Sequence, residues 1–407
     1  MNAARQTALR QALFGWLNLA LTAPAVYLWL GLPLLMRQQG WSGVDIGLFQ
    51  LAGVPALFKF VLAAPIERSA GAGKGRAYRR WSIALCLLFC ALLLVLGWRD
   101  WLDHRMTLFA LAMGAALLAT WTDIPVNALA IRMLPEAQRL RAGGIRSAAL
   151  SLGAIVGGGL MLLLQTRWGW RAPFWLMAAL LAFGAAGLCW LPRPSRDDAV
   201  APDASGNWRG YFAQRAAPRW NVLLLLCFPF IGSAWFYLKP LLLDHGFAAG
   251  QVALIAGVGG GVVAALASLA TVRLVRRIGV AGALPGVTML SLLALLALAL
   301  AVWLRSPAGL IAAALLVALA MGAAASLAFG LMMYFARPGH SAADYGVQAS
   351  LFAAGRMAVP LAAGVLLDQA GYGGMLLGLA VAMAAVTVLA YDSRALIASR
   401  TSDQSGS

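Results

Sequence analysis

The stretch WTDIPVNALAIRMLPEAQRLR, residues 121–141, places an acidic side chain inside an apolar run that begins near Met106. Asp123 and Asn127 lie well within this run, which ends at Pro135, where a basic segment follows. Residues four apart share one face of an α-helix, so the spacing predicts a polar face on a membrane-length helix. A charge in such a helix is costly and usually faces a partner or a watery cavity, so this face is our first candidate site.

The composition of the whole chain indicates a membrane protein. Hydrophobic residues make up 62% of the 407 residues and charged residues only 11%, whereas soluble domains are about 45–50% apolar. The sequence repeats apolar runs of about 20 residues, each long enough to cross a bilayer as a helix. We therefore expect an all-α polytopic membrane protein.

The apolar runs predict twelve spans in two sets of six, separated by a polar linker. We expect an N-terminal six-helix bundle at 1–191, a cytoplasmic linker at 192–219, a C-terminal six-helix bundle at 220–392 and a disordered tail at 393–407. In the first span, Pro24 and the residues 31–33 predict kinks. The spans are expected at about 12–36, 44–66, 81–98, 106–131, 143–165, 172–191, 220–243, 250–272, 282–304, 308–335, 346–367 and 374–391.

The net charge of +17 is explained mainly by topology. With both termini in the cytoplasm, the twelve-span arrangement puts most of the 31 basic residues on cytoplasmic segments, as the positive-inside rule requires. We therefore expect contact with membrane lipid and no nucleic-acid partner.

An internal repeat supports the division into two halves. The shift that places Gly144 over Gly346 aligns the fifth span with the eleventh, puts Gly153 on Gly355, and matches residues 168–170 with 370–372. Two six-helix halves of the same orientation resemble the architecture of major facilitator transporters, which bind substrate between the halves near the middle of the membrane. We expect that fold, with two pseudo-symmetric halves.

Three charged residues lie deep in the predicted spans, at roughly 11–16 Å from the span ends when each residue rises ~1.5 Å. They are Lys59, Asp123 and Arg356. Asp123 has two interpretations: a carboxylate that couples transport to protons, or one partner of a static ion pair with Lys59. Lys59 and Arg356 either attract an anionic substrate or hold helices together.

Aromatic residues near these charges have two readings as well. They can form belts at the membrane interfaces, or they can face a cavity that suits a ring-containing ligand. The aromatic candidates for substrate binding or gating are Tyr27, Trp29, Trp121, Trp235 and Tyr237, which join Lys59, Asn127 and Arg356 in that group.

Several other classes of site are not supported by the sequence. The three histidines stand far apart in predicted loops, so we expect no metal site and no intramembrane Ser-His or paired-acid enzyme. A phosphate-cradling loop is also missing from the sequence, so direct use of ATP and a bound cofactor are not expected.

Two motifs resemble a particular branch of the major facilitator superfamily, the peptide/acetyl-coenzyme-A transporters. FKF at 58–60 followed by APIER at 64–68 resembles the second-span signature of that branch, and residues 123–135 resemble its fourth-span motif. Two departures are Glu67, where an aspartate is usual, and Asn127, where many members carry a second acid. The resemblance implies a cytoplasmic-loop motif formed by Glu67, Arg68, Arg76, Arg79 and Arg80.

The resemblance implies a secondary transporter of the bacterial inner membrane. The branch includes AmpG-type muropeptide permeases and RhtX/FptX-type siderophore permeases, and the compact twelve-span length favours the siderophore group. We therefore expect a monomeric, proton-coupled importer of a siderophore or a ferric siderophore, with muropeptide or peptide uptake as the alternative. In this interpretation Asp123 carries the coupling proton.

Overall fold

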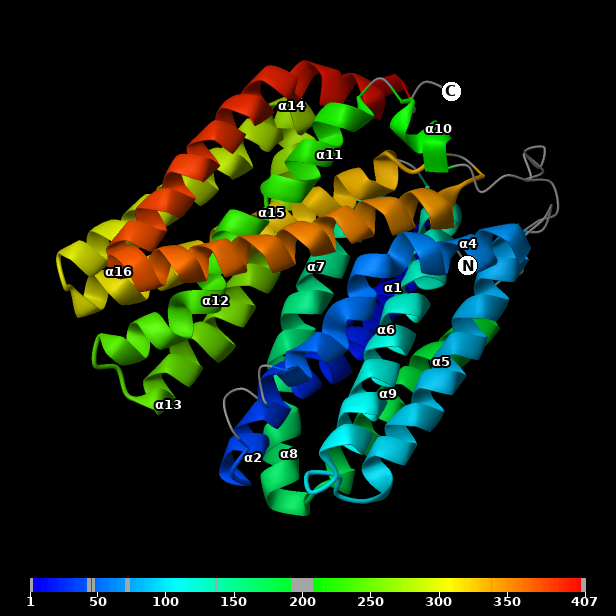
Figure 1. The fold of residues 1–407 in the computed structure, drawn as a ribbon. Coiled ribbons are helices and arrows are strands. Elements are labelled where there is room, and N and C mark those ends of the chain that lie inside the picture. The colour runs from blue at the N-terminus through cyan, green and yellow to red at the C-terminus, as the bar shows by residue number, and fades with distance from the viewer. Residues whose placement is uncertain are drawn as a thin grey trace. The chain divides into compact units, whose positions relative to one another are not determined.

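The structure, a computed structural model, describes residues 3–41, 45, 48–69, 74–135, 138–191, 208–214, 216–337 and 339–403. All regular elements in these ranges are helices (Figure 1). Nine helices among them are long and apolar enough to cross a membrane. The prediction of an all-α polytopic membrane protein is therefore confirmed.

The first sequence half consists of helices that follow the predicted spans closely. They are α1 (Ala3–Val26), η1 (Tyr27–Gly31), α2 (Leu32–Gln38), η2 (Gln50–Phe58), α4 (Lys59–Ser69), α5 (Lys74–Trp98), α6 (Arg105–Met133), α7 (Arg139–Ile155), η5 (Val156–Leu160), α8 (Met161–Trp168) and α9 (Arg171–Trp190).

The second half is built in the same way. Its helices are α10 (Trp208–Phe212), α11 (Ala217–Leu226), α12 (Pro229–Asp244), α13 (Ala249–Val252), η6 (Ala253–Gly259), α14 (Gly260–Trp303), α15 (Pro307–Tyr334) and α16 (Ser341–Asp403). Helix α16 contains two predicted spans, and α14 contains one together with the second part of another. Gly371 and Gly279 break these helices with positive φ angles.

The expected kink in the first span has a specific form. Residues Tyr27–Gly31 adopt a π-helical turn between Pro24 and Pro33. Pro33 has no N–H to offer the carbonyl four residues before it, so the regular α pattern cannot continue through this point. A π turn absorbs the irregularity while the chain stays helical.

The internal repeat is confirmed by backbone geometry. Gly169 and Gly371, which the repeat aligns, have φ angles of 76° and 65° and ψ values of −175° for both. A second glycine pair that the repeat aligns, Gly153 and Gly355, also has matching surroundings. A Cβ on Gly153 would lie 3.2 Å from the Leu19 carbonyl oxygen, and a Cβ on Gly355 would lie 2.2 Å from the Leu225 carbonyl oxygen. The fifth and eleventh spans therefore pack by glycine against the first and seventh.

The contacts divide the chain into two compact units that differ from the sequence halves at two places. Unit 1 comprises Met1–Pro135, Leu152–Trp208 and Ala336–Ser350, and unit 2 comprises Glu136–Ser151, Arg209–Phe335 and Leu351–Ser407. Each unit thus includes a short helical segment from the other half of the sequence.

Within unit 1, helices α1, α5, α6 and α9 pack side by side, and α4 lies against α6 (Figure 1). Within unit 2, α14 and α15 pack along each other and α12 contacts both. The start of α7 joins this group through a close approach, since a Cβ on Gly143 would lie 2.3 Å from the Gly330 nitrogen. The Ser147 and Ser268 hydroxyl oxygens, 2.8 Å apart, add a buried hydrogen bond.

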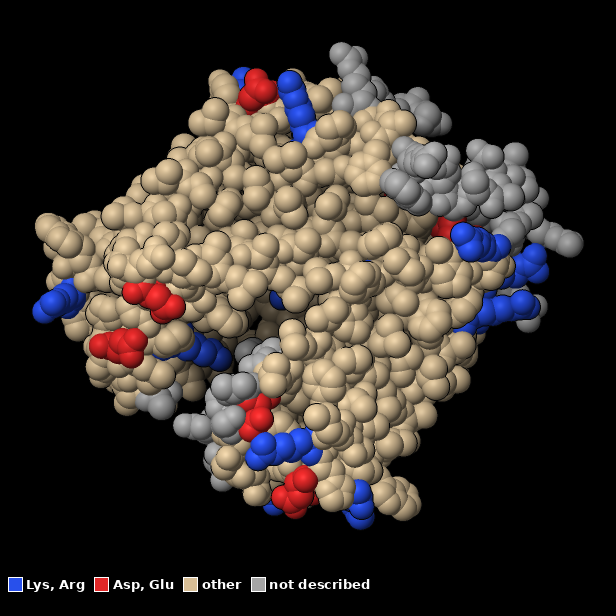
Figure 2. Space-filling model, in the orientation of Figure 1, with Lys and Arg blue, Asp and Glu red and all other residues tan. Residues whose placement is uncertain are grey.

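Charged residues are sparse over the middle of the helices. Most charged side chains on the face drawn in Figure 2 lie near its margins, and uncharged residues cover most of the rest. A surface of this composition suits contact with lipid hydrocarbon.

The end of the chain differs from expectation. We predict a disordered tail from residue 393, but α16 continues to Asp403. The segment SRALIAS contains strong helix formers, and its Ser393 and Ile397, four residues apart, are both fully buried. Residues 404–407 and most of the predicted linker, 192–207, lie outside the described residues, while α10 and α11 show that its last part is helical.

The glycine break in α16 can be tested directly. We expect Gly371→Ala to lower the free energy of unfolding by about 1–2 kcal/mol, because an L side chain is strained at this φ. Gly373→Ala is the control, since its added Cβ meets nothing within 4 Å and its φ is not positive. Thermal unfolding of both purified variants in one detergent measures the difference, and equal melting temperatures would contradict the argument.

Candidate functional site

The carboxylate of Asp123 is the centre of a hydrogen-bonded group in unit 1. Its Oδ2 accepts a bond of 2.6 Å from the Lys59 ammonium and another of 2.6 Å from the Tyr345 hydroxyl. Its Oδ1 accepts a bond of 2.8 Å from the Asn127 carboxamide nitrogen. Asp123 is 9% exposed, so these donors replace most of the water that the charge would otherwise hold.

Lys59 is placed by an irregular second span. Nine residues of 3₁₀ helix, η2, run up to Phe58, and α4 starts at Lys59 itself. Such a long 3₁₀ run is uncommon and often marks a hinge or strain. The Lys59 and Asp123 side chains are 15% and 13% exposed. The ion pair considered from the sequence is thus present, and it lies mostly away from solvent.

Asn127 stands one helical turn from Asp123, as its spacing predicts. Its Nδ2 donates both to the Asp123 carboxylate and to the Asp123 backbone carbonyl, each at 2.8 Å. Its Oδ1 is buried and accepts no hydrogen bond from the residues that the structure describes. A buried acceptor without a protein donor is a place that an ordered water can fill.

Tyr345 is the member of this group that sequence reasoning missed. It comes from the start of α16, more than 200 positions further along the chain, and it is fully buried. The available signal was its place next to Gly346, the residue that the repeat aligns with Gly144. Only the tertiary structure shows that this helix start belongs to unit 1.

Glu67 of the predicted loop motif is a buried helical residue. Its Oε2 accepts hydrogen bonds from the Tyr78 hydroxyl at 2.9 Å and from the Ala342 and Ala343 backbone nitrogens at 3.2 Å each. Those two N–H groups are in the first turn of α16, where a helix has no internal acceptors for them. Glu67 therefore caps α16 and fixes the segment that carries Tyr345.

The arginines of the motif do not share one environment. Arg79 donates to the carbonyls of Cys189 and, at 3.1 Å, Leu191, and so satisfies the end of α9. Arg68, Arg76 and Arg80 are exposed.

The aromatic candidates of unit 1 lie in different surroundings. Tyr27 is fully buried, bonds to Gln165 and meets Phe174 edge-on with the ring centroids 5.4 Å apart. Trp29 is half-buried against Gly53. The Trp121 ring lies 5.6 Å from the Trp81 ring, and its indole nitrogen has no hydrogen-bond partner in the described part of the chain.

The remaining candidates belong to unit 2. The Trp235 ring fills the space beside Gly260, where an added Cβ would lie 2.0 Å from it. The Tyr237 hydroxyl donates to the Pro360 carbonyl at 2.9 Å. Arg356 is exposed, and its guanidinium carbon lies 5.9 Å from the centroids of the Phe228 and Phe352 rings.

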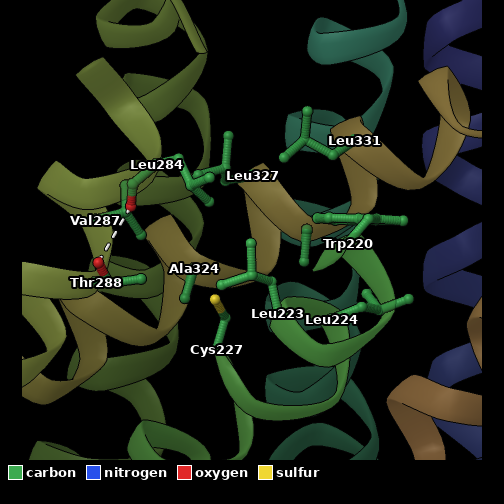
Figure 3. Close-up of a pocket in the computed structure, with 11 residues that line it drawn as sticks. Trp220, Leu223, Leu224, Cys227, Leu284, Val287, Thr288, Ala324, Leu327 and Leu331 are labelled. Carbon is green, nitrogen blue, oxygen red and sulfur yellow. Dashed lines mark hydrogen bonds between the residues drawn. The ribbon is translucent and has the colours of Figure 1, made fainter. Parts of the chain in front are cut away.

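Unit 2 also encloses a small cavity of about 20 Å³ between α11, α14 and α15 (Figure 3). Its lining is nearly all apolar, with Trp220 and several leucines, and the Cys227 sulfur. The Thr288 hydroxyl there already donates to the backbone carbonyls of Leu284 and Pro285. A cavity with so few polar partners is a packing void and not a site for a polar substrate.

The comparisons with known proteins identify the family. A model of the Major Facilitator Superfamily matches residues 14–360. The chain therefore belongs to the major facilitator superfamily, and it is a membrane transporter and not an enzyme. The resemblance seen in the second and fourth spans is confirmed at this level.

Curated relatives include permeases whose name states a substrate. Anhydromuropeptide permease of Escherichia coli strain K12 is 29% identical over 247 residues, which are 55% of this chain and 49% of that protein. The same permease of E. coli O157:H7 gives the same values. The chain thus spans about half the length of the curated relatives it matches.

Solved structures agree with the fold. The chain resembles the E. coli fucose:proton symporter FucP with a TM-score of 0.70 and 18% identity, covering 94% of this chain and 97% of that one. It resembles a bacterial homologue of the iron transporter ferroportin with a TM-score of 0.73 and 15% identity, covering 96% and 99% of the two chains. At these identities the likeness concerns the fold alone.

The burial of the ion pair generates a stability prediction. Lys59→Met leaves the Asp123 charge without its cation and should lower the free energy of unfolding by about 2 kcal/mol. The double variant Lys59→Met/Asp123→Asn removes both charges and should recover most of the loss.

Arg105→Met is the matched control, because it breaks the more exposed pair with Asp45, whose side chains are 51% and 32% exposed. That change should alter stability by less than about 1 kcal/mol. Chemical unfolding of the purified variants measures all three, and a double variant no more stable than Lys59→Met would contradict the pairing argument.

Proposed function

We propose that this transporter is a proton-coupled importer of anhydromuropeptides or related peptide-bearing sugars. The observation that carries the coupling is the buried Asp123 carboxylate with Lys59, Asn127 and Tyr345 bonded to it. The relative that is 29% identical, an anhydromuropeptide permease, supports this substrate class over the siderophore expected from the sequence.

The coupling follows from the charge of Asp123. The Lys59 ammonium and the two other donors stabilise the ionised carboxylate, which can accept a proton only when these bonds rearrange. A carboxylate inside a membrane-spanning helix with a competing cation is an arrangement suited to proton relay. Asp123 would bind a proton in one conformation of the transport cycle and release it in another.

The substrate class gives Arg356 a role. A muropeptide carries peptide carboxylates, and a guanidinium binds a carboxylate by two parallel hydrogen bonds. Arg356 is exposed and makes no ion pair or hydrogen bond with the residues that the structure describes. A charge at such depth faces water or ligand more favourably than lipid. We propose that Arg356, flanked by Phe228 and Phe352, binds a substrate carboxylate.

The distribution of basic residues supports placing the chain in the bacterial inner membrane with both termini in the cytoplasm. In this orientation the capped start of α16 lies on the cytoplasmic side, together with Glu67. Import would then end with release of substrate and proton at that side.

The test of the function is uptake of radiolabelled anhydromuropeptide into proteoliposomes, with and without a proton gradient that is acidic outside. We expect accumulation only with the gradient. Asp123→Asn should abolish accumulation while retaining exchange of labelled for unlabelled substrate, because the site remains but cannot carry the proton.

A ferric siderophore offered to the same vesicles provides the comparison of substrates. Siderophore accumulation without muropeptide uptake would overturn the substrate, and undiminished accumulation by Asp123→Asn would overturn the coupling role.

The carboxylate role of Arg356 makes a separate prediction. Arg356→Gln should weaken the apparent affinity for the muropeptide by about tenfold or more, as expected for loss of a charged hydrogen bond. Arg276→Gln, an exposed arginine on α14, is the control and should bind as the wild type does. A muropeptide whose peptide carboxylates are amidated should bind the wild type and Arg356→Gln with equal affinity. If Arg356→Gln lost the same affinity for the amidated and the unmodified muropeptide, the assignment would be contradicted.

A further inference from the structure

We infer that Tyr345 is a positioning residue that links the protonation of Asp123 to the docking of the start of α16 on α4. The inference deepens the proposed function and rests on it, since it concerns the same carboxylate. The geometry behind it lies wholly within unit 1.

The first turns of α16 attach to α4 along one face. The Ala342 and Ala343 nitrogens bond to Glu67. Further along, a Cβ on Gly346 would lie 3.0 Å from the Lys59 carbonyl, and the Ser350 hydroxyl accepts a bond of 3.1 Å from the Phe60 nitrogen. Residues 342, 346 and 350 are spaced by four, so they stack on one helix face. Tyr345 is next to this face.

The hydroxyl of Tyr345 reaches beyond α4 to α6. It donates to Asp123 Oδ2, the same oxygen that accepts from Lys59, and both bonds measure 2.6 Å. This hydrogen bond joins the segment 341–350 directly to the carboxylate that is proposed to carry the proton. The helix start and the proton site thus share a single oxygen atom.

The chemistry of that oxygen makes protonation of Asp123 and docking of the helix start oppose each other. The ionised Oδ2 accepts from both the ammonium and the phenol. A proton from solvent that binds to Oδ2 forms an O–H bond there and neutralises the carboxylate beside Lys59. The oxygen then accepts more weakly than the ionised carboxylate does, so the bond from Tyr345 of α16 to α6 is weakened.

Linkage makes this effect reciprocal. If docking of α16 disfavours a proton on Asp123, a proton on Asp123 must disfavour docking by the same factor. The bond of a hydroxyl to a charged group typically corresponds to about one pH unit in such a linkage. Tyr345 can therefore set how strongly one proton loosens a whole helix start.

Other titratable groups in the neighbourhood must be separated from this effect. Glu67 accepts from the same helix start and from Tyr78. Asp344 accepts bonds of 2.8 Å and 2.7 Å from the Arg337 guanidinium. Acid could loosen α16 through either carboxylate, but neither route depends on the hydroxyl of Tyr345 or on the charge of Asp123.

Hydrogen exchange of the segment 341–350, measured by mass spectrometry between about pH 5 and about pH 8, tests the linkage. It needs no substrate, so it can succeed or fail independently of the uptake assay. After correction for intrinsic exchange rates, we expect the protection factor of the wild-type segment to fall about tenfold as the pH is lowered.

Four proteins are compared in the same lipid nanodiscs. Tyr345→Phe removes one oxygen and keeps the ring, and it should flatten the protection profile, because docking of the helix start then no longer depends on the proton at Asp123. Asp123→Asn should make the protection independent of pH. Tyr211→Phe is the matched control, since its hydroxyl is also buried but bonds to Asn221 in unit 2, and it should keep the wild-type profile.

A structural role for Tyr345 alone would lower protection equally at every pH, and this outcome would overturn the inference. It would also fail if the profile persisted in Asp123→Asn, because Glu67, Asp344 or His340, which interacts electrostatically with Asp344, would then be responsible. Should Tyr345→Phe not fold, the Asp123→Asn profile still tests whether the charge of Asp123 controls the protection, and a pH dependence like that of the wild type would overturn the inference. In uptake, Tyr345→Phe should shift the pH dependence in the wild-type background and have no effect on exchange in the Asp123→Asn background.

Discussion

The constraint on which unit 1 depends is the need to hold one carboxylate inside a membrane-length helix. An isolated charge at Asp123 would be strongly destabilising, and the surrounding architecture supplies three donors for it. Each donor is placed by a different structural feature. Lys59 begins a helix after an unusual 3₁₀ run, the Asn127 carboxamide lies one helical turn from Asp123, and Tyr345 belongs to a helix start that is distant in the sequence. The irregular second span and the capped start of α16 both serve this single group.

Close backbone approach is the second organising feature. Gly143 and Gly346 lie at helix starts that join the unit opposite to their own sequence half, and an added Cβ at either would meet neighbouring atoms at 2.3 Å and 2.8 Å. Small residues let helices approach in a membrane without a hydrophobic driving force. Because the repeat aligns the two segments that make these contacts, each unit contains one close glycine contact of this kind.

The fold could be predicted in detail, because membrane spans are encoded locally. The lengths of the apolar runs predict the spans. The internal repeat aligns Gly169 with Gly371, and the backbone angles of these two glycines match. The prediction of disorder fails for residues 393–403, because helix propensity and the burial of Ser393 and Ile397, four residues apart, outweigh the polar composition of this segment. The candidate site was predicted only in part, since Asp123, Asn127 and Lys59 stand out as polar residues in apolar runs, whereas a tyrosine near a helix end does not.

The sequence by itself determined the class of protein, the positions of the spans and the presence of charges that had to be paired, because hydrophobic length and the cost of burying a charge act on local segments. Only the tertiary structure decided which groups complete the pair. Tyr345 and Glu67 acquire their partners because the start of α16 folds into unit 1. Arg356 belongs to unit 2, although it follows Tyr345 in the same helix. Pairing between segments far apart in the chain depends on packing geometry that no local pattern records.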